Sequence, residues 1–140
     1  MTTDTTAGDT LADDYVLPFS TDRSRVLGRL VRLGPLADEI LKRHDYPAPA
    51  SEVLGQALAL TSMLGSTLKF EGSLIIQTST DGPLGLLVVN FEAPGRLRGY
   101  ASVDRDAIEA LSADKLDHAR LLGNGHMALT IDPGGSMDRY

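Results

Sequence analysis

Residues Ala50–Pro83, ASEVLGQALALTSMLGSTLKFEGSLIIQTSTDGP, join a long uncharged run to a short β-branched run and a turn. The uncharged run is Val53–Leu68, in which leucines recur near helical spacing and small residues occupy much of the remaining surface. A helix that is apolar or small on every side must be covered on every side. We therefore predict a buried central helix at residues 52–68, with Ser51 and Glu52 as its cap region.

A membrane span is the competing interpretation of the same run. A spanning helix needs about 20 apolar residues. Five polar side chains interrupt this run: Gln56, Thr61, Ser62, Ser66 and Thr67. The first residues of the chain, MTTDTTAGDTLADD, also lack the apolar core of a signal peptide. We therefore expect a cytoplasmic protein that makes no membrane contact.

A β-hairpin is predicted directly after the helix. Leu74–Thr78 is short and β-branched, Asp81–Pro83 has turn chemistry, and Leu84–Phe91 is apolar on both faces. Alternation sorts the second strand into two sets, which are Leu84, Leu86 and Val88, and Leu87, Val89 and Phe91. One set should meet the helix. The other is either a second layer of core or a surface for another subunit or an unfolded protein.

Shorter elements flank this centre. Gly28 within the run Arg25–Leu33, and Gly34-Pro35 after it, favour a strand over a helix. Clean alternation at Arg96–Val103 predicts a strand with one solvated face. The remaining predicted elements are an apolar anchor packed on the body at Tyr15–Phe19, a helix at Leu36–His44, a rigid linker at Tyr46–Pro49, one or two helical turns at Asp106–Leu111, and a strand at Met127–Ile131. Together they predict an α+β fold in which a mixed or antiparallel sheet packs around the helix at residues 52–68.

The charged residues are unevenly distributed. Residues 1–22 hold five acids and no Lys or Arg, whereas the other 118 residues hold 14 acids and 13 bases. We therefore predict a disordered acidic tail at residues 1–14 and one domain at residues 15–140. The body has no basic stripe of the kind that nucleic acid requires, so we expect no nucleic-acid partner. The arginines of the run 25–33 are interpreted as a solvated face: Arg25, Arg29 and Arg32.

No combination of residues predicts catalysis. His44-Asp45 is the nearest pair, but adjacent residues at a helix end seldom point together, and a place at the negative helix C-terminus explains His44. His118 and His126 have no metal-ligand spacing. Cysteine is absent, which excludes disulfides, thiol catalysis and any Cys-ligated zinc within these residues. We therefore predict no enzyme and no catalytic, metal-ligating or cofactor-binding residue.

Three further clusters have simple structural explanations. Gly65-Ser66 lacks the second glycine of a G-x-S-x-G nucleophile elbow. Gly123–Gly125 is interpreted as a turn and not as an anion cradle, because no Lys or helix N-terminus follows it. A local group of carboxylates fits one face of a short surface helix: Asp104, Asp106 and Glu109.

Four separately spaced blocks of the chain resemble the thirty-three kilodalton heat-shock chaperone family, the redox-regulated holdases. The blocks are GRLVRLGPLADEILKRHDYP, LGQALALTSMLGSTLKFEG with the strand and DGP after it, GRLRGYA, and LLGNGHMALTIDPG. They extend over roughly Arg23–Tyr140, which makes the resemblance far more specific than one short motif. At Gln56 the family's helix usually carries a glutamate, so any charged contact there would be lost or weakened in this chain.

The resemblance implies ATP-independent binding of unfolded or partly folded proteins. The apolar strand surface and the sheet edge expected from the residues also allow a homodimer. Family members carry a C-terminal module in which four cysteines bind zinc and act as the redox switch. None of these cysteines is present in the sequence. Residues 15–140 therefore resemble an incomplete N-terminal substrate-binding domain, and zinc is expected only in the absent module. The resemblance assigns no client-binding residue.

Two other functions stay open at this point. One is a dimerisation module without client affinity, and the other is a small hydrolase that uses His44 and a nearby acid. The strand at Met127–Ile131 is followed by a turn at Pro133-Gly134, with only Asp138–Tyr140 beyond it to form a return strand. We therefore expect an exposed sheet edge that pairs with other chains, and self-association that is linked to client binding.

Overall fold

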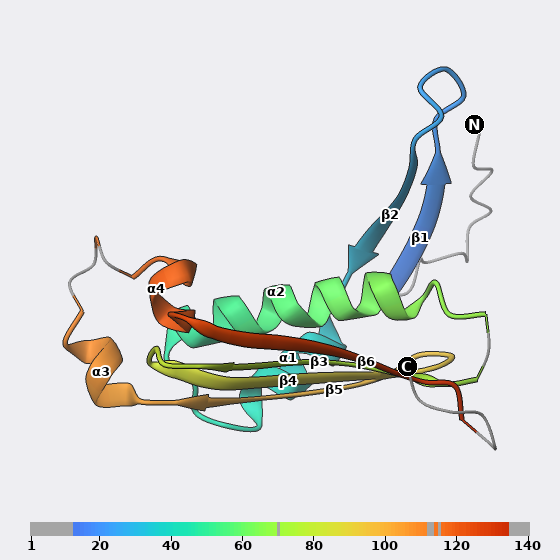
Figure 1. The fold of residues 1–140 in the computed structure, drawn as a ribbon. Helices are drawn as coiled ribbons and strands as arrows, with labels where there is room; N and C mark the ends of the chain where they lie inside the picture. Colours follow the sequence, from blue (N-terminus) through green and yellow to red (C-terminus); the bar gives the residue numbers. More distant parts are fainter. Residues whose placement is uncertain (1–12, 70, 112–113, 115, 135–140) are drawn as a thin grey trace.

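A four-stranded antiparallel sheet with one long helix packed on it forms the body of the protein (Figure 1). The structure is a computed structural model that describes residues 13–69, 71–111, 114 and 116–134. The strand order in the sheet is β5-β4-β3-β6. The strands are β3 (Ser73–Thr80), β4 (Leu84–Glu92), β5 (Arg96–Val103) and β6 (Gly125–Asp132). The predicted α+β class and the antiparallel alternative for the sheet are confirmed.

The central helix α2 spans Ala48–Gly65, so it starts and ends earlier than the predicted 52–68. Pro47 is its N-cap and Pro49 lies in its first turn. The first helical N–H groups need no intrahelical partner, so proline is tolerated there. The segment predicted as a rigid linker is therefore partly the first turn of the helix. At the other end, the hydroxyl of Thr67 donates to the Leu64 carbonyl at 2.6 Å in the turn after the helix.

The core lies between α2 and the sheet. Leu54 and Leu58 of α2 are fully buried, as are Leu84 and Val89 of β4. The set of β4 side chains that meets the core is Leu84, Leu87, Val89 and Phe91. The prediction that Leu84 faces away from this set is wrong, because a β-bulge between Leu84 and Leu86 shifts the alternation by one residue.

Complete coverage of α2 was also predicted, and this prediction is wrong. Leu60 is 44% exposed and Leu64 is 38% exposed on the side of the helix away from the core. The helix packs on β3, β4 and β5 through one face, and only part of the rest is covered by the strand β2 (Leu27–Arg32) and by two short helices. These helices are α1 (Pro35–Lys42) and α4 (His118–Leu122).

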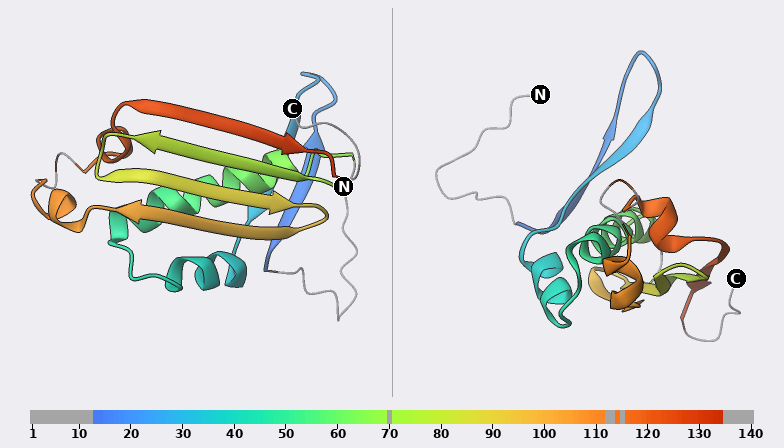
Figure 2. Two further views of the ribbon diagram at one scale, coloured as in Figure 1. Left: turned by 60° about the horizontal axis from the view of Figure 1, so that its bottom comes forward. Right: turned by 90° about the vertical axis from the view of Figure 1, so that its left-hand side faces the viewer.

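A separate two-stranded hairpin projects from the body beside the C-terminal half of α2 (Figures 1 and 2). It consists of β1 (Tyr15–Ser20) and β2 (Leu27–Arg32), and we call it the arm. The strand at β2 was predicted. The prediction that Tyr15–Phe19 packs on the body holds for its first two residues, because Tyr15 and Val16 are half-buried and line a cavity with Ser62 and Phe91. It is wrong for the rest of the segment, where Leu17 is 41% and Phe19 52% exposed.

The short helix α3 (Arg105–Glu109) follows β5, close to the predicted helical turns. No helix within the described ranges is long and apolar enough to cross a membrane. Residues 1–12 of the predicted acidic tail lie outside the described residues, whereas Asp13 pairs with Arg32 of the arm and Asp14 accepts a hydrogen bond from the Gly34 N–H at the start of α1.

Candidate functional site

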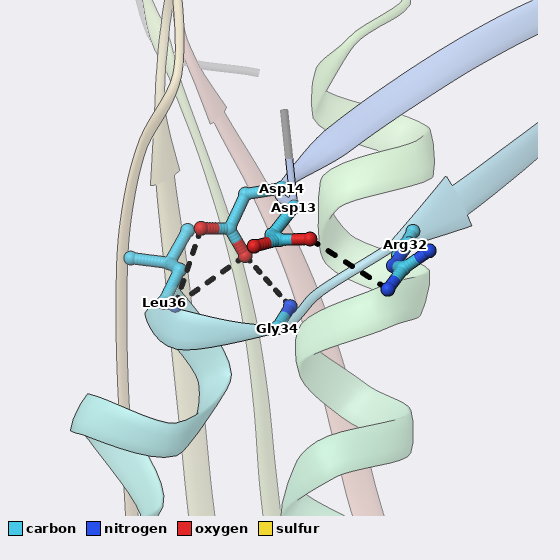
Figure 3. Close-up of polar contacts among 5 residues, drawn as sticks. All are labelled: Asp13, Asp14, Arg32, Gly34 and Leu36. Carbon is cyan, nitrogen blue, oxygen red and sulfur yellow. Dashed lines mark hydrogen bonds and ion pairs between the residues drawn. The ribbon is translucent and has the colours of Figure 1, made fainter. Parts of the chain in front are cut away.

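The base of the arm is fixed by the carboxylate of Asp14 (Figure 3). This carboxylate accepts hydrogen bonds from the backbone N–H groups of Gly34 at 2.7 Å and Leu36 at 3.3 Å. Both N–H groups belong to the start of α1, where helical donors lack intrahelical partners. Asp13 instead forms an exposed ion pair with Arg32 at 3.6 Å. Asp14 therefore joins the first strand of the arm to the helix that follows the second.

One face of the arm is apolar and exposed. Cross-strand pairs place Leu17 opposite Leu30 and Phe19 opposite Gly28, so these side chains share a face. The ring of Phe19 lies over Gly28, where a Cβ would come within 2.2 Å of the Phe19 Cζ atom. The glycine is thus required by a close approach. Leu30 is 54% exposed, so this face has no cover among the described residues.

A groove of about 430 Å³ lies between the arm and the C-terminal half of α2. Arg29 is the one charged residue among the described residues that line it. The lining residues are Pro18, Phe19, Leu27, Gly28 and Arg29 from the arm and Met63, Leu64 and Thr67 from α2 and the turn after it. We call this feature the arm groove. Its walls are mostly apolar, and Leu27 at its margin is 85% exposed.

A second apolar area lies on the edge strand β6. Leu129 pairs with Ile76 and Met127 pairs with Thr78, so both side chains lie on the face of the sheet that carries α2. The helix contacts β3, β4 and β5, whereas β6 lies beyond it at the edge of the sheet (Figure 2). Met127 is consequently 69% and Leu129 50% exposed. We call these two residues the β6 strip.

The structure separates the residues that came nearest to a catalytic prediction. The His44 ring packs edge-on against Tyr100, at a centroid distance of 5.2 Å, and tilts against Tyr46. The carboxylate of Asp45 is fully exposed and pairs with Arg105 at 3.6 Å. The helix α1 ends at Lys42, so His44 lies beyond the helix that was predicted to contain it. The two side chains therefore have separate partners and form no acid–base pair.

The other weighed residues also have structural partners. His118 lies 3.6 Å from the carboxylate of Glu52, and His126 is on β6 opposite Ser79. The Asp104 carboxylate caps α3 by accepting from the Ala107 N–H at 3.1 Å. The short surface helix predicted for Asp104, Asp106 and Glu109 is thus present.

The two glycine motifs are tied to the fold. The backbone N–H of Asn124 donates to the Asp81 carboxylate at 2.7 Å, so the Gly123–Gly125 turn is joined to the β3–β4 turn. A Cβ on Gly65 would lie 2.2 Å from the Phe91 ring, so this glycine allows α2 to approach β4. The Ser66 hydroxyl donates to the Met63 carbonyl at 2.8 Å. Gln56 is exposed on α2.

The family profile described as Hsp33 protein matches residues 14–140. The chain belongs to the Hsp33 family. The match starts at Asp14, so it includes the arm and the residue that fixes its base.

The curated relatives of this Hsp33 chain are named 33 kDa chaperonin. The protein from Caulobacter vibrioides is 45% identical over 130 residues, which is 91% of this chain and 43% of the relative. The protein from Shewanella woodyi is 39% identical over 123 residues, or 88% of this chain and 41% of the relative. The chain therefore spans less than half the length of these relatives.

A solved structure has the same fold. The crystal structure of the 33 kDa chaperonin from Thermotoga maritima matches with a TM-score of 0.75 at 20% identity. The match covers 92% of this chain and 46% of the other. At 20% identity, the match shows that the two chains share a fold and nothing further.

The zinc that the family resemblance implies does not fit the residues present. The sequence contains no cysteine. Among residues 13–69, 71–111, 114 and 116–134, no group of three or more His, Cys, Asp or Glu side chains is placed to hold a metal ion.

The apolar surfaces were not assigned from the sequence. The sequence contains a bulky Phe19 and a glycine at position 28, but only the register of the hairpin places the ring over the glycine. The exposure of the β6 strip had no local signal, since it depends on where α2 crosses the sheet.

Proposed function

We propose that this chain provides a client-holding surface of an ATP-independent chaperone. The observation that carries the proposal is the exposure of large apolar side chains in the arm groove and on the β6 strip. An unfolded protein exposes apolar segments of its own, and removing both surfaces from water favours association by about 25 cal/mol per Å² of apolar area. No covalent bond is made or broken in such a function.

The comparisons support the proposal at the level of the family. The curated relatives bear the name 33 kDa chaperonin, and this chain covers less than half of their length. For this chain we infer unfolded or partly folded polypeptides as partners, a cytoplasmic location, and no nucleic-acid, membrane or catalytic role.

Suppression of client aggregation, followed by light scattering, tests this function. The purified chain is added to a thermally unfolding client, and the concentration that halves the scattering is measured. The double variant Met127→Thr with Leu129→Thr should require a severalfold higher concentration, because both residues are exposed and Thr suits a strand. Ala128→Thr is the matched control on the opposite face of β6. Absence of any suppression by the unmodified chain would refute the proposal.

A dimerisation module is the alternative that one observation favours. β6 is an edge of the sheet in the described part of the chain, and an edge strand has unpaired backbone groups that another chain can bind. Sedimentation at micromolar concentration separates the two functions. A chain that forms dimers but does not suppress aggregation is a dimerisation module, whereas loss of both properties in the β6-strip variant shows that they share a surface.

A further inference from the structure

We propose that the arm groove selects extended polypeptide segments in which an apolar side chain lies next to an acidic one. This inference rests on the proposed holding function and names the class of segment that this surface prefers. The apolar side chain would enter the groove, and the carboxylate would contact Arg29 at its margin.

The groove has the size and lining for a side-chain anchor. Its volume of about 430 Å³ lies within the range of about 300–1,000 Å³ that is usual for ligand pockets. Most of its wall is apolar, from Phe19 and Leu27 of the arm and Met63 and Leu64 of α2. A polypeptide can insert a Leu or Phe side chain there while the rest of the segment runs along the exposed arm.

Arg29 is available to an incoming carboxylate. It lines the groove, and it has no ion-pair partner within the described ranges. The neighbouring arginine of β2, Arg32, already pairs with Asp13. A guanidinium at the margin of an apolar groove forms stronger hydrogen bonds with a carboxylate than a neutral donor does.

The charge of the arm differs from that of the rest of the chain. Residues 15–33 contain one acid, Asp22, and the four arginines Arg23, Arg25, Arg29 and Arg32. The formal net charge of the whole chain is −6. This net charge does not decide binding at the arm, because the screening length is about 8 Å at physiological ionic strength and the arm projects away from the body (Figure 1).

A polypeptide fits this surface better than a nucleic acid does. Nucleic-acid affinity comes mainly from several simultaneous phosphate contacts along a basic stripe. Among the described residues the groove instead has a single charged residue between apolar walls, and Phe19 is the one aromatic side chain that they contribute. The arginines alone would attract an RNA strand weakly, so RNA serves as a competing probe in the test.

Fluorescence anisotropy with three labelled peptides tests the inference. The first peptide carries Leu-Asp repeats, the second replaces each Asp with Lys, and the third replaces each Leu with Ser. The Leu-Asp peptide should bind most tightly. Arg29→Gln should weaken its binding about fivefold, which is the upper range for one partly exposed ion pair, and should not weaken the Leu-Lys peptide. Leu27→Ser should weaken both Leu-containing peptides, and it should still fold because Leu27 is 85% exposed.

Arg96→Gln is the matched control, since Arg96 is an exposed arginine that already pairs with Glu92 at 3.5 Å. Equal affinity for the Asp and Lys peptides, or unchanged affinity in Arg29→Gln, would overturn the inference. Tighter binding of an RNA oligonucleotide, or a change of oligomeric state in Arg29→Gln, would also overturn it by assigning another occupant. If aggregation of an uncharged apolar client is still suppressed in these cases, the holding function stands and only the selectivity fails.

Discussion

The helix–sheet body and the arm contain similar apolar residues, but only the body buries them. Leu54, Leu58 and Val89 of the body have no exposed surface, whereas Leu27 of the arm is 85% exposed and Phe19 is 52% exposed. The body has two layers, a helix against a sheet, and the arm is a single two-stranded layer. An isolated hairpin is only marginally stable in water. Stability is therefore concentrated in the body, and the arm contributes contact surface.

The largest expected effect comes from a charge placed in the core of the body. Leu58→Asp should abolish folding, because an unpaired buried carboxylate costs several kcal/mol against a total stability of about 5–15 kcal/mol. Leu60→Asp is the matched control two residues along the same helix, where the side chain is already 44% exposed. Thermal unfolding followed by circular dichroism compares the two. A transition near that of the unmodified chain in Leu58→Asp would show that the body does not depend on this face of α2.

A smaller effect is expected where α2 approaches the sheet. Gly65→Ala should lower the free energy of unfolding by about 1–3 kcal/mol, because its Cβ would lie 2.2 Å from the Phe91 ring. Among the described residues, a Cβ added at Gly55 would have no neighbour within 4 Å beyond the adjacent residues and the local helix backbone. Gly55→Ala should therefore raise the free energy of unfolding by up to about 1 kcal/mol through helix propensity. Urea titration measures both. If the two variants shifted the midpoint in the same direction, the close approach of α2 to Phe91 would be incorrect.

Removing the Asp14 carboxylate tests whether the arm can be destabilised while the body remains stable. Asp14→Ala removes the carboxylate that accepts from Gly34 and Leu36, and loss of such a cap costs about 1–2 kcal/mol. Hydrogen exchange should become faster in β1 and β2 while β3 and β4 remain protected. Asp13→Ala is the matched control, because it removes only an exposed ion pair worth about 0–1 kcal/mol. Equal acceleration in both strand pairs would mean that arm and body unfold together.

The sequence predicts the body better than the arm for identifiable reasons. The alternation of Arg96–Val103 matches β5 residue for residue, because a strand with one solvated face has a period of two. The uncharged run that contains Leu54 and Leu58 predicted α2, although the start of the helix was missed because proline is tolerated in a first turn. The bulge beside Leu84 leaves no mark on local composition.

The arm and the β6 strip depend on tertiary arrangement, which local patterns do not contain. Leu17 and Phe19 have the composition of a buried segment, and they are exposed because no second layer covers that face within the described part of the chain. Met127 and Leu129 alternate as core residues of a strand do, and they are exposed because α2 crosses the sheet elsewhere. The candidate surface was therefore not predictable residue by residue, whereas the absence of thiol chemistry followed directly from composition.

The smallest expected effect is that of peroxide on client binding. An increase in binding would indicate a thiol switch, whereas a decrease would indicate oxidation of methionine. Without a cysteine, peroxide cannot form a disulfide in this chain, so it should not switch client binding on. Slow oxidation of methionine should instead weaken binding, because a polar sulfoxide would replace apolar surface at Met127 on the β6 strip and at Met63 in the arm groove. Light scattering before and after peroxide should show a modest loss of suppression. The double variant Met63→Leu with Met127→Leu should resist this loss. An increase in suppression that a thiol reductant reverses would contradict the prediction, since no group in the sequence supports such a cycle.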